Sequence, residues 1–289
     1  MKHSFDITDN EFELLKGLIY NQTGICLDDC KKAFLASRLK KRLASLHLNS
    51  FREYYNYLIG HPRGQKEMMQ MISLITTGKT EFFREEEHFK FLTTNVFPYF
   101  LKRTIANQRR PELYIWSAGC STGEEAYSLA MVTNDFFNVY PYWQIEILAT
   151  DIDIEALNKA KAGIYTEKEI SSLPLTYRKR YFHKIEPQKF KANDTLRRLI
   201  TFKYLNLSTA PFYFGRKFDV IFCRNVIIYL HPEIKKKIIQ GFYTTLADDG
   251  FLFLGHSESL LSLDRGLFSL VTPSIYQKAS LGISSNARL

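Results

Sequence analysis

The 289-residue sequence lacks several features that would assign it to other classes of protein. It has no run of roughly 18 apolar residues, so no helix is expected to span a membrane. Its first residues lack the apolar stretch of a signal peptide, and the chain shows no internal repeat. The four cysteines, Cys26, Cys30, Cys120 and Cys223, match neither a disulfide framework nor a paired zinc signature. These absences favour a reduced, cytoplasmic protein.

What the sequence does contain is a large apolar fraction and an excess of positive charge. Hydrophobic residues make up 45% of the chain, which is too many for a disordered protein. The length is near the limit for one hydrophobic core, so a large domain and a smaller one are expected. The net charge of +9 is compatible with nucleic acid, anionic lipid or an acidic protein surface as a partner.

The first 77 residues show helical patterns and predict an all-α domain. Thr8 and Glu11 have the spacing of a capping box, in which each side chain accepts a hydrogen bond from the other's backbone N–H. Residues 30–46 combine leucines at spacings of three and four with many lysines and arginines. This segment is therefore predicted to be a helix with one buried face and one basic face.

The remainder of the chain alternates short apolar runs with helical patterns. Such alternation predicts a doubly wound parallel sheet, and therefore an α/β, Rossmann-like domain over residues 91–289, joined by a linker at 78–90. The predicted strands cover residues 113–117, 144–150, 218–223 and 251–254, and the predicted helices cover 124–137, 154–162 and 233–246. A turn is expected at 248–250. Between about 181 and 204 three short strands follow one another, which predicts a small antiparallel β-subdomain insert.

A loop of small residues joins the first predicted strand to the first predicted helix of this domain. Small residues allow a ligand to approach the backbone, and a helix N-terminus offers free N–H groups. Glu124 and Glu125 occupy this helix start, where they would repel a pyrophosphate and attract an ammonium group. They could equally serve only to complement the helix dipole.

Asp151 follows the second strand, at a position suited to accepting hydrogen bonds from ribose hydroxyls. A helix-capping role is the alternative. A ribose site beside an ammonium site, without a phosphate site, describes S-adenosylmethionine. Thr80 and Arg84 add polar groups at the domain junction, where ligand sites are common.

Five segments in chain order resemble the CheR-type chemotaxis receptor glutamate O-methyltransferases. They are TEFFRE at residues 80–85, WSAGCSTGEE at 116–125, ATDID at 149–153, FDVIFCRN at 218–225 with Tyr229, and GHSE at 255–258. The resemblance implies methyl transfer from S-adenosylmethionine to receptor glutamates, with a small helical domain, a Rossmann-like domain and a β-subdomain. The family usually has Asn where Gly78 stands, which leaves one side-chain contact in doubt.

The resemblance also implies a set of cofactor-binding residues. Thr80 and Arg84 would line the methionine side, Glu125 would meet the amino group and Asp151 would hold the ribose. The full set that it implies is Gly78, Thr80, Arg84, Glu125, Asp151, Asn206, Leu207, Arg224 and Asn225.

The expected chemistry needs little from the protein beyond positioning. A glutamate acceptor is ionised at neutral pH, so no general base is required, and the sulfonium is already an activated leaving group, so no metal is expected. Arg84 is predicted to orient a carboxylate of the acceptor or of the cofactor, and Tyr229 to flank the transferred methyl group. Tyr229 could equally be a half-buried structural aromatic. His256 is interpreted as structural.

In this family the basic helix is thought to face the glutamate-rich cytoplasmic helical region of the receptors. Arg38, Lys41 and Arg42 are therefore predicted to bind the substrate, against the alternative of a solvated basic face. In some family members the β-subdomain also binds a receptor C-terminal peptide, so the resemblance implies this as a second candidate partner. A monomer is expected, without nucleic acid and without membrane insertion.

Three other functions compete with this interpretation. A nucleic-acid methyltransferase suits the charge, but the sequence shows no Asn-Pro-Pro-Tyr type motif and no RNA-binding signature. A non-catalytic module that binds S-adenosylmethionine or S-adenosylhomocysteine remains an alternative because of Gly78. An NAD-linked enzyme is disfavoured by the two glutamates at the helix start.

Overall fold

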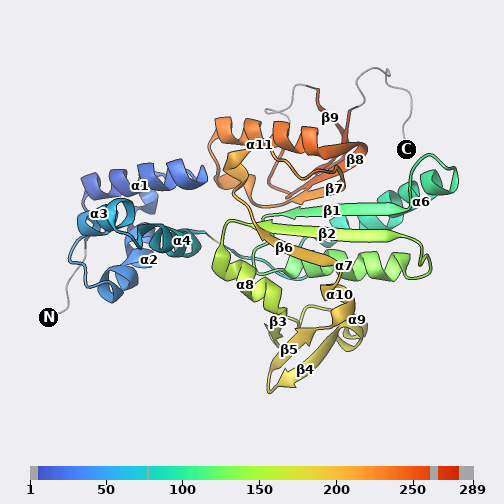
Figure 1. The fold of residues 1–289 in the computed structure, drawn as a ribbon, viewed down its shortest axis with the longest axis horizontal. Helices are drawn as coiled ribbons and strands as arrows, with labels where there is room; N and C mark the ends of the chain where they lie inside the picture. Colours follow the sequence, from blue (N-terminus) through green and yellow to red (C-terminus); the bar gives the residue numbers. More distant parts are fainter. Residues whose placement is uncertain (1–5, 77, 261–265, 280–289) are drawn as a thin grey trace.

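The computed structural model describes residues 6–76, 78–260 and 266–279, and its first unit is a helical domain (Figure 1). Its helices are α1 (Asp9–Thr23), α2 (Lys32–Ser45), α3 (Phe51–Gly60) and α4 (Gly64–Ile75), with a 3₁₀ turn η1 (Asp29–Lys31) before α2. The predicted capping box is confirmed, because the Glu11 N–H bonds Thr8 Oγ1 at 3.3 Å and the Thr8 N–H bonds Glu11 Oε2 at 2.9 Å. The apolar faces of these helices form one separate core.

The second unit is built on a seven-stranded sheet in the order β6-β2-β1-β7-β8-β10-β9. The strands are β1 (Glu112–Ala118), β2 (Gln144–Asp151), β6 (Ile200–Tyr204), β7 (Phe218–Cys223), β8 (Leu246–Leu254), β9 (Phe268–Thr272) and β10 (Ile275–Lys278). Neighbours from β6 to β8 run parallel, and β10 and β9 continue the sheet antiparallel. The predicted doubly wound α/β domain is thus confirmed.

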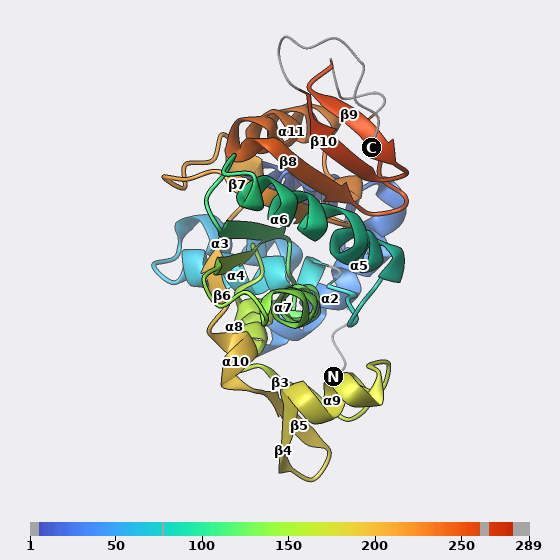
Figure 2. The same ribbon diagram turned by 90° about the vertical axis from the view of Figure 1, so that its right-hand side faces the viewer.

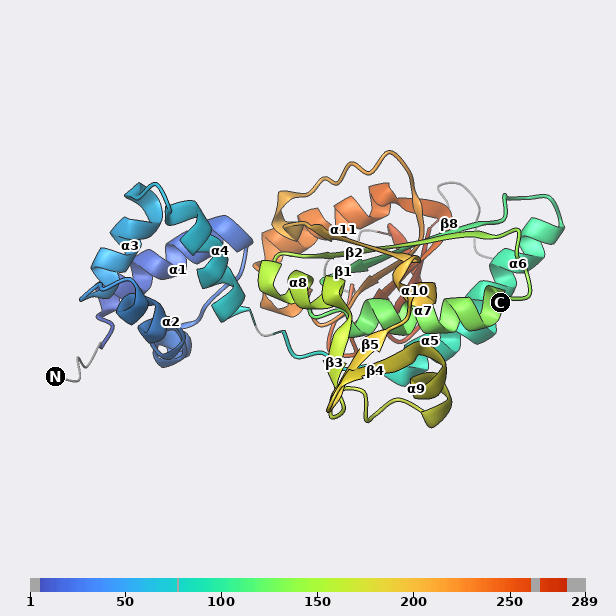
Figure 3. The ribbon, with the colours of Figure 1, turned by 60° about the horizontal axis from the view of Figure 1, so that its bottom comes forward.

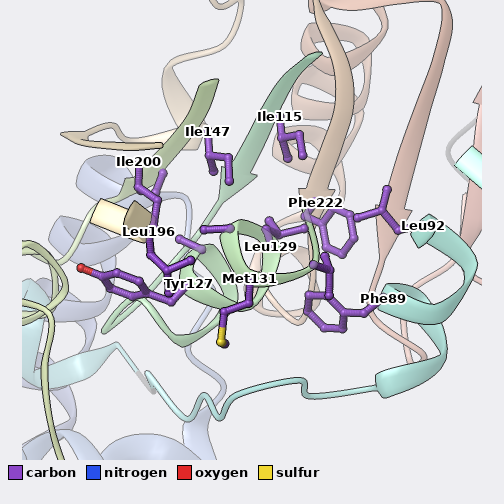
Figure 4. Close-up of a cluster of buried hydrophobic side chains, with 14 of the residues drawn as sticks. Phe89, Leu92, Ile115, Tyr127, Leu129, Met131, Ile147, Leu196, Ile200 and Phe222 are labelled. Carbon is purple, nitrogen blue, oxygen red and sulfur yellow. The ribbon is translucent and has the colours of Figure 1, made fainter. Parts of the chain in front are cut away.

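Helices cover both faces of this sheet (Figures 1 and 2). They are α5 (Glu86–Phe91), the π-helix η2 (Leu92–Val96), α6 (Phe97–Ile105), α7 (Glu124–Phe137), α8 (Ile154–Ala162) and α11 (Pro232–Thr245). Consecutive residues of β1 point to opposite faces. Ile115 joins the core formed with α5, α6 and α7, which Figure 4 shows, and Trp116 joins the core under α11.

The β-subdomain is present, but its limits differ from the predicted 181–204. Its strands are β3 (Ile164–Thr166), β5 (Lys189–Ala192) and β4 (Phe182–Glu186), in the order β3-β5-β4, and α9 (Leu175–Tyr181) and α10 (Asp194–Arg197) accompany them. The insert therefore begins earlier than expected. It also ends earlier, because β6 pairs parallel with β2 in the main sheet and buries Ile200 opposite Ile147.

Two further expectations need correction. Residues 248–250 do not form a turn but lie within β8, whose pairing with β7 shifts register between Phe218 and Val220. The predicted linker at 78–90 ends earlier than expected, because α5 begins at Glu86, and no helix was predicted over residues 86–105. Among the described residues, no helix has both the length and the apolarity needed to cross a membrane.

The helical domain lies beside the sheet domain (Figure 3), and the segment that follows α1 contacts the sheet domain. Ile25 forms an antiparallel bridge with Leu230, and the Cys26 N–H donates to Tyr229 O at 3.0 Å. On the other side of the junction, Ser73 Oγ of α4 donates to Asp153 Oδ1 at 2.6 Å. The helical domain therefore contacts segments of the sheet domain that follow β7 and segments that follow β2.

Candidate active site

A cavity between the two units brings together every predicted cofactor-binding and catalytic residue. Its lining includes Gly78, Thr80, Arg84, Glu125, Asp151, Asn206, Leu207, Arg224, Asn225 and Tyr229. The cavity lies where the parallel strands end and the strand order reverses, between β1 and its neighbours β2 and β7. Open α/β sheets bind ligands at such a point.

The loop after β1 shapes one wall of this cavity. Gly119 and Gly123 adopt φ angles of 95° and 99°, in the left-handed region that favours glycine. A Cβ at Gly119 would lie 2.4 Å from Val226 Cγ2, so the loop packs too closely for any other residue. The Ser121 N–H donates to Asp151 Oδ2 at 2.7 Å, which fixes the loop to the end of β2.

Asp151 lines the cavity, and each of its two carboxylate oxygens accepts a hydrogen bond from a backbone N–H group. Besides Ser121, the Asp153 N–H donates to Asp151 Oδ1 at 2.8 Å. Burial raises the pKa of Asp151 to about 6, and these backbone N–H groups oppose the shift. The helix-capping alternative does not describe this residue, because it is Asp153 that caps α8 through the Ala156 N–H at 3.0 Å.

The two glutamates at the start of α7 have different surroundings. Glu125 lines the cavity, accepts a hydrogen bond from Ser117 Oγ at 2.6 Å and lies 3.4 Å from Arg224 Nη1. Glu124 instead turns to Thr122, whose Oγ1 donates to it at 2.6 Å. Burial raises the pKa of both carboxyls. Only Glu125 is thus placed to meet a ligand, although the sequence suggested both.

Arg224 is the central cation of the site, with a side chain only 1% exposed. It lies 3.1 Å from Glu85 Oε2, and it also donates to the carbonyl of Arg84. Arg84 in turn donates from Nη1 to Lys79 O at 2.9 Å. The TEFFRE segment is therefore held against the sheet through its backbone, and the Arg84 side chain remains half-buried at the cavity.

The Asn225 segment is held by Glu258, a residue of the GHSE motif to which the sequence assigned no role. Oε2 of Glu258 accepts from the Asn225 and Gly255 N–H groups, both at 2.7 Å, and Oε1 accepts from Val226 at 2.9 Å. Asn225 itself has a φ of 58°. A carboxylate that accepts several backbone N–H bonds can hold such a conformation. Glu258 is therefore a positioning residue.

The remaining predicted residues line the wall shared by both units. Asn206 Nδ2 donates to Gln22 O at 2.7 Å, so this side chain also links the units. Tyr229 is 47% exposed, and its backbone carries the bond to Cys26. At Gly78, a Cβ would lie 2.8 Å from Ser121 Oγ. An asparagine here, as is usual in the family, requires that hydroxyl to move.

Sequence reasoning missed the contribution of the helical domain to the cavity. Its lining residues include Ile25, Cys26, Leu27, Lys31 and Phe34. The basic helix, which Lys31 and Phe34 begin, was identified from the sequence. However, no residue pattern indicates that the segment after α1 pairs with Leu230 and so brings this helix to the cavity.

The three residues predicted to bind the substrate divide into two groups. Arg38 and Lys41 are exposed on α2, and the Arg38 guanidinium lies 5.2 Å from the centre of the Phe34 ring. Arg42 instead forms two bonds with the buried Glu67, from Nε at 2.8 Å and from Nη2 at 2.5 Å. The expected docking role thus competes with a structural one at Arg42.

The residues of the cavity fit S-adenosylmethionine. Carboxylates at Glu125 and Asp151 suit an ammonium group and two ribose hydroxyls, while apolar Leu207 suits a base. The closely packed glycine at residue 119 brings backbone to the cavity wall, as a nucleoside site requires.

Comparison with known proteins agrees with this assignment. The model of the CheR methyltransferase SAM-binding domain matches residues 78–276, and the all-alpha domain of the same family matches residues 10–76. The chain belongs to the CheR methyltransferase family. It is therefore an S-adenosylmethionine-dependent methyltransferase of chemotaxis.

Relatives of this CheR-family chain align along almost its whole length. The chemotaxis protein methyltransferase of Borreliella burgdorferi is 37% identical over 95% of this chain and 96% of its own. That of Escherichia coli K12 is 36% identical over 96% of this chain and 93% of its own. The probable chemotaxis protein methyltransferase of Rhizobium etli is 38% identical over 93% of this chain and 100% of its own.

Proposed function

We propose that this chain transfers a methyl group from S-adenosylmethionine to glutamate side chains of chemotaxis receptors. The products would be glutamate methyl esters and S-adenosylhomocysteine. The observation that carries the proposal is the single cavity that gathers all predicted cofactor residues beside the exposed basic face of α2. An anionic acceptor and a cationic cofactor both find complementary charge there.

The cavity residues have distinct proposed roles in holding the cofactor. Glu125 offers its carboxylate to the ammonium group, and Asp151 accepts hydrogen bonds from the ribose. Thr80 and Arg84 face the methionine portion. Leu207 contacts the adenine, with Asn206 beside it, and Arg224 and Asn225 close the pocket, while Gly78 leaves room for the loop at Ser121.

The chemistry requires alignment more than activation. S-adenosylmethionine supplies a methyl group on a sulfonium centre, so a carboxylate oxygen can form the new O–C bond as the S–C bond breaks. The acceptor carboxylate is ionised at neutral pH and needs no base. Correct orientation alone can contribute roughly 7–11 kcal/mol in favourable cases. Arg84 is proposed to orient the acceptor or cofactor carboxylate, and Tyr229 to flank the reacting methyl group.

Receptor docking is proposed for the exposed cations of α2. Arg38 and Lys41 are free to meet a glutamate-rich helical bundle, and Lys31 extends the positive charge to the cavity itself. Phe34 lies between them and lines the cavity. An acidic receptor helix lying along α2 would therefore bring its glutamates towards the methyl donor.

The β-subdomain supports a second, separate contact with receptors. β4 lies at an edge of the order β3-β5-β4, so its outer side can accept an added strand. We expect a receptor C-terminal peptide to bind there, as in some family members. Peptides methylated at alternate backbone nitrogens test this: one pattern should abolish binding and the other preserve it. Equal binding of both would contradict strand addition.

Transfer of radiolabelled methyl groups into receptor-containing membranes tests the main proposal. We expect base-labile label in the receptor, because methyl esters hydrolyse in base. Base-stable label would indicate another acceptor, and label in added nucleic acid would favour the rival methyltransferase. Cofactor binding without transfer would identify a non-catalytic module.

Arg84→Ala tests the proposed orienting role. The variant should retain its fold, because the Arg84 cation is half-buried and donates to the backbone carbonyl of Lys79 rather than to a buried carboxylate. We expect methyl transfer to fall at least tenfold. A full transfer rate with unchanged cofactor affinity would show that Arg84 has neither role.

A further inference from the structure

Three side chains next to Arg224 bring potential metal-ligand atoms together. Nδ1 of His88 lies 3.4 Å from Oε2 of Glu85, and Nε2 of His256 lies 3.9 Å from the same oxygen. All three atoms lie within 4.8 Å of one another. Glu85 and His88 come from the start of α5, and His256 comes from the GHSE segment after β8.

Nε2 of His88 is hydrogen-bonded to Ser274 Oγ at 2.8 Å, and the Ser274 hydroxyl also lies 2.6 Å from Pro273 O. We assign the His88 proton to Nε2, because the Ser274 hydroxyl is then free to donate to Pro273 O. Nδ1 of the neutral ring is then a lone pair. This atom is buried and has no hydrogen-bond partner among the described residues, in a side chain only 2% exposed.

Nδ1 of His88 and Oε2 of Glu85 lie 3.4 Å apart, and neither atom forms a hydrogen bond among the described residues, although Arg224 Nη2 forms an ion pair with the same Glu85 oxygen at 3.1 Å. A buried nitrogen lone pair without a donor is costly. A cation between the two atoms would satisfy the His88 lone pair. The Ser274 hydroxyl already fixes the ring in the manner of the outer-shell partners of metal-binding histidines.

We propose that Glu85, His88 and His256 form a binding site for a divalent cation of the zinc type. Two imidazoles and one carboxylate suit zinc and its neighbours better than magnesium or calcium. Ligands at about 2.1 Å in tetrahedral geometry lie about 3.4 Å apart, the separation already present between His88 and Glu85. Nε2 of His256, 3.9 Å from the same Glu85 oxygen, must move closer to complete the set.

The surroundings of the site determine its access and strength. His256 is 58% exposed, and a cavity of about 430 Å³ is lined by both histidines, so an ion can enter. Arg224, 3.1 Å from Glu85 Oε2, opposes additional positive charge. The site should thus bind more weakly than a closed four-ligand zinc centre. Lys90 also lines the cavity, and Glu87 partly offsets it.

Zn²⁺ titration against a chromophoric chelator tests the proposal. The full chain should carry Cys26→Ser and Cys30→Ser, because those exposed thiols can bind zinc themselves. We expect one Zn²⁺ per chain, and at least tenfold weaker affinity in His256→Ala. Ser274→Ala, which releases the His88 ring, should weaken binding by about 10- to 100-fold.

His183→Ala is the matched control, because this histidine is exposed on β4 of the other sheet. Co²⁺ provides a second readout. Bound to two imidazole nitrogens and a carboxylate oxygen, it should show visible absorption bands, and these should disappear in His256→Ala. Circular dichroism verifies that each variant is folded. Equal Zn²⁺ affinity in His256→Ala and His183→Ala, or no stoichiometric binding by the parent chain, would overturn the proposal.

Discussion

At the scale of single residues, Asp151 illustrates how surroundings set both protonation and role. Its carboxylate is held by two backbone N–H groups, yet burial raises its pKa to about 6. Ribose hydroxyls donate to the ionised form, so binding should favour that form. Protonation below pH 6 should therefore remove the acceptor that we propose for the ribose hydroxyls.

We accordingly expect the affinity for S-adenosylhomocysteine to fall as the pH decreases from 7 to 5. The limiting slope is about tenfold per pH unit if only ionised Asp151 binds. Calorimetric titration at several pH values measures this. Asp151→Asn should bind about ten- to a hundredfold more weakly at pH 7 and lose most of the pH dependence. An undiminished slope in Asp151→Asn would contradict the assignment.

Glu258 offers a test of positioning without contact to a ligand. Both of its oxygens accept backbone N–H bonds from the segments at Asn225 and Gly255. In Glu258→Gln one oxygen becomes an NH₂ group that faces an N–H, so the unfolding free energy should decrease by about 2–4 kcal/mol. Urea denaturation measures the loss. Glu233→Gln, exposed on α11, is the control and should change stability by less than about 0.5 kcal/mol.

At the scale of elements, the basic helix α2 carries an ion-paired cation, Arg42, and an exposed cation, Arg38, one turn apart. Arg42 forms its ion pair with Glu67 of α4, and the hydroxyl of Tyr54 in α3 donates to the same carboxylate at 2.9 Å. Three helices thus share one buried negative charge. Arg38 has its cation in solvent above Phe34.

We expect Arg42→Ala to reduce the unfolding free energy by about 1–3 kcal/mol, because it leaves Glu67 buried and without its cation. Arg38→Ala should leave stability within about 0.5 kcal/mol and reduce receptor methylation instead. Thermal unfolding and methylation rates, measured on both variants, distinguish the two roles. Equal stability of the two variants would show that the ion pair contributes nothing.

The helices and strands also show where the sequence pattern alone was enough to predict their limits. The helix predicted over 124–137 and the strand predicted over 218–223 match α7 and β7 residue for residue, because each has a clear start signal or an unbroken apolar run. The insert was misplaced because β6 and β4 are both short and similar in composition. The two strands differ only in their partners, since β6 pairs with β2 and β4 pairs with β5, and strand pairing depends on residues distant in sequence. Small and acidic residues indicated the parts of the pocket around Glu125 and Asp151, whereas Asn206 and Arg224 were implied only by the family resemblance. The bonds of Glu258 and Arg42 could not be predicted, because they depend on partners distant in sequence.

At the scale of the whole molecule, the net charge of +9 is proposed to attract an acidic receptor, and the effect of ionic strength on methylation tests this. The screening length falls from about 10 Å at 0.1 M salt to about 3 Å at 1 M. Receptor methylation should therefore slow with added salt if exposed cations such as Arg38 and Lys41 guide docking.

The expected result is a KM for receptor that rises several-fold between low and high salt, with little change in cofactor affinity. Charge reversal by Arg38→Glu should raise KM at low salt and reduce its salt dependence. Lys179→Glu, on α9 of the β-subdomain insert, makes the same charge change away from α2. If both variants respond alike, net charge rather than the α2 face controls the reaction.

The bridge between Ile25 and Leu230 has a consequence for how such chains can be recombined. The segment after α1 supplies part of the cavity wall, so the catalytic pocket is encoded by stretches more than two hundred positions apart. A chimera that exchanges the helical domain with that of a relative would therefore also replace a wall of the pocket. Receptor preference and cofactor affinity should change together in such hybrids unless residues 23–27 remain with their native partner.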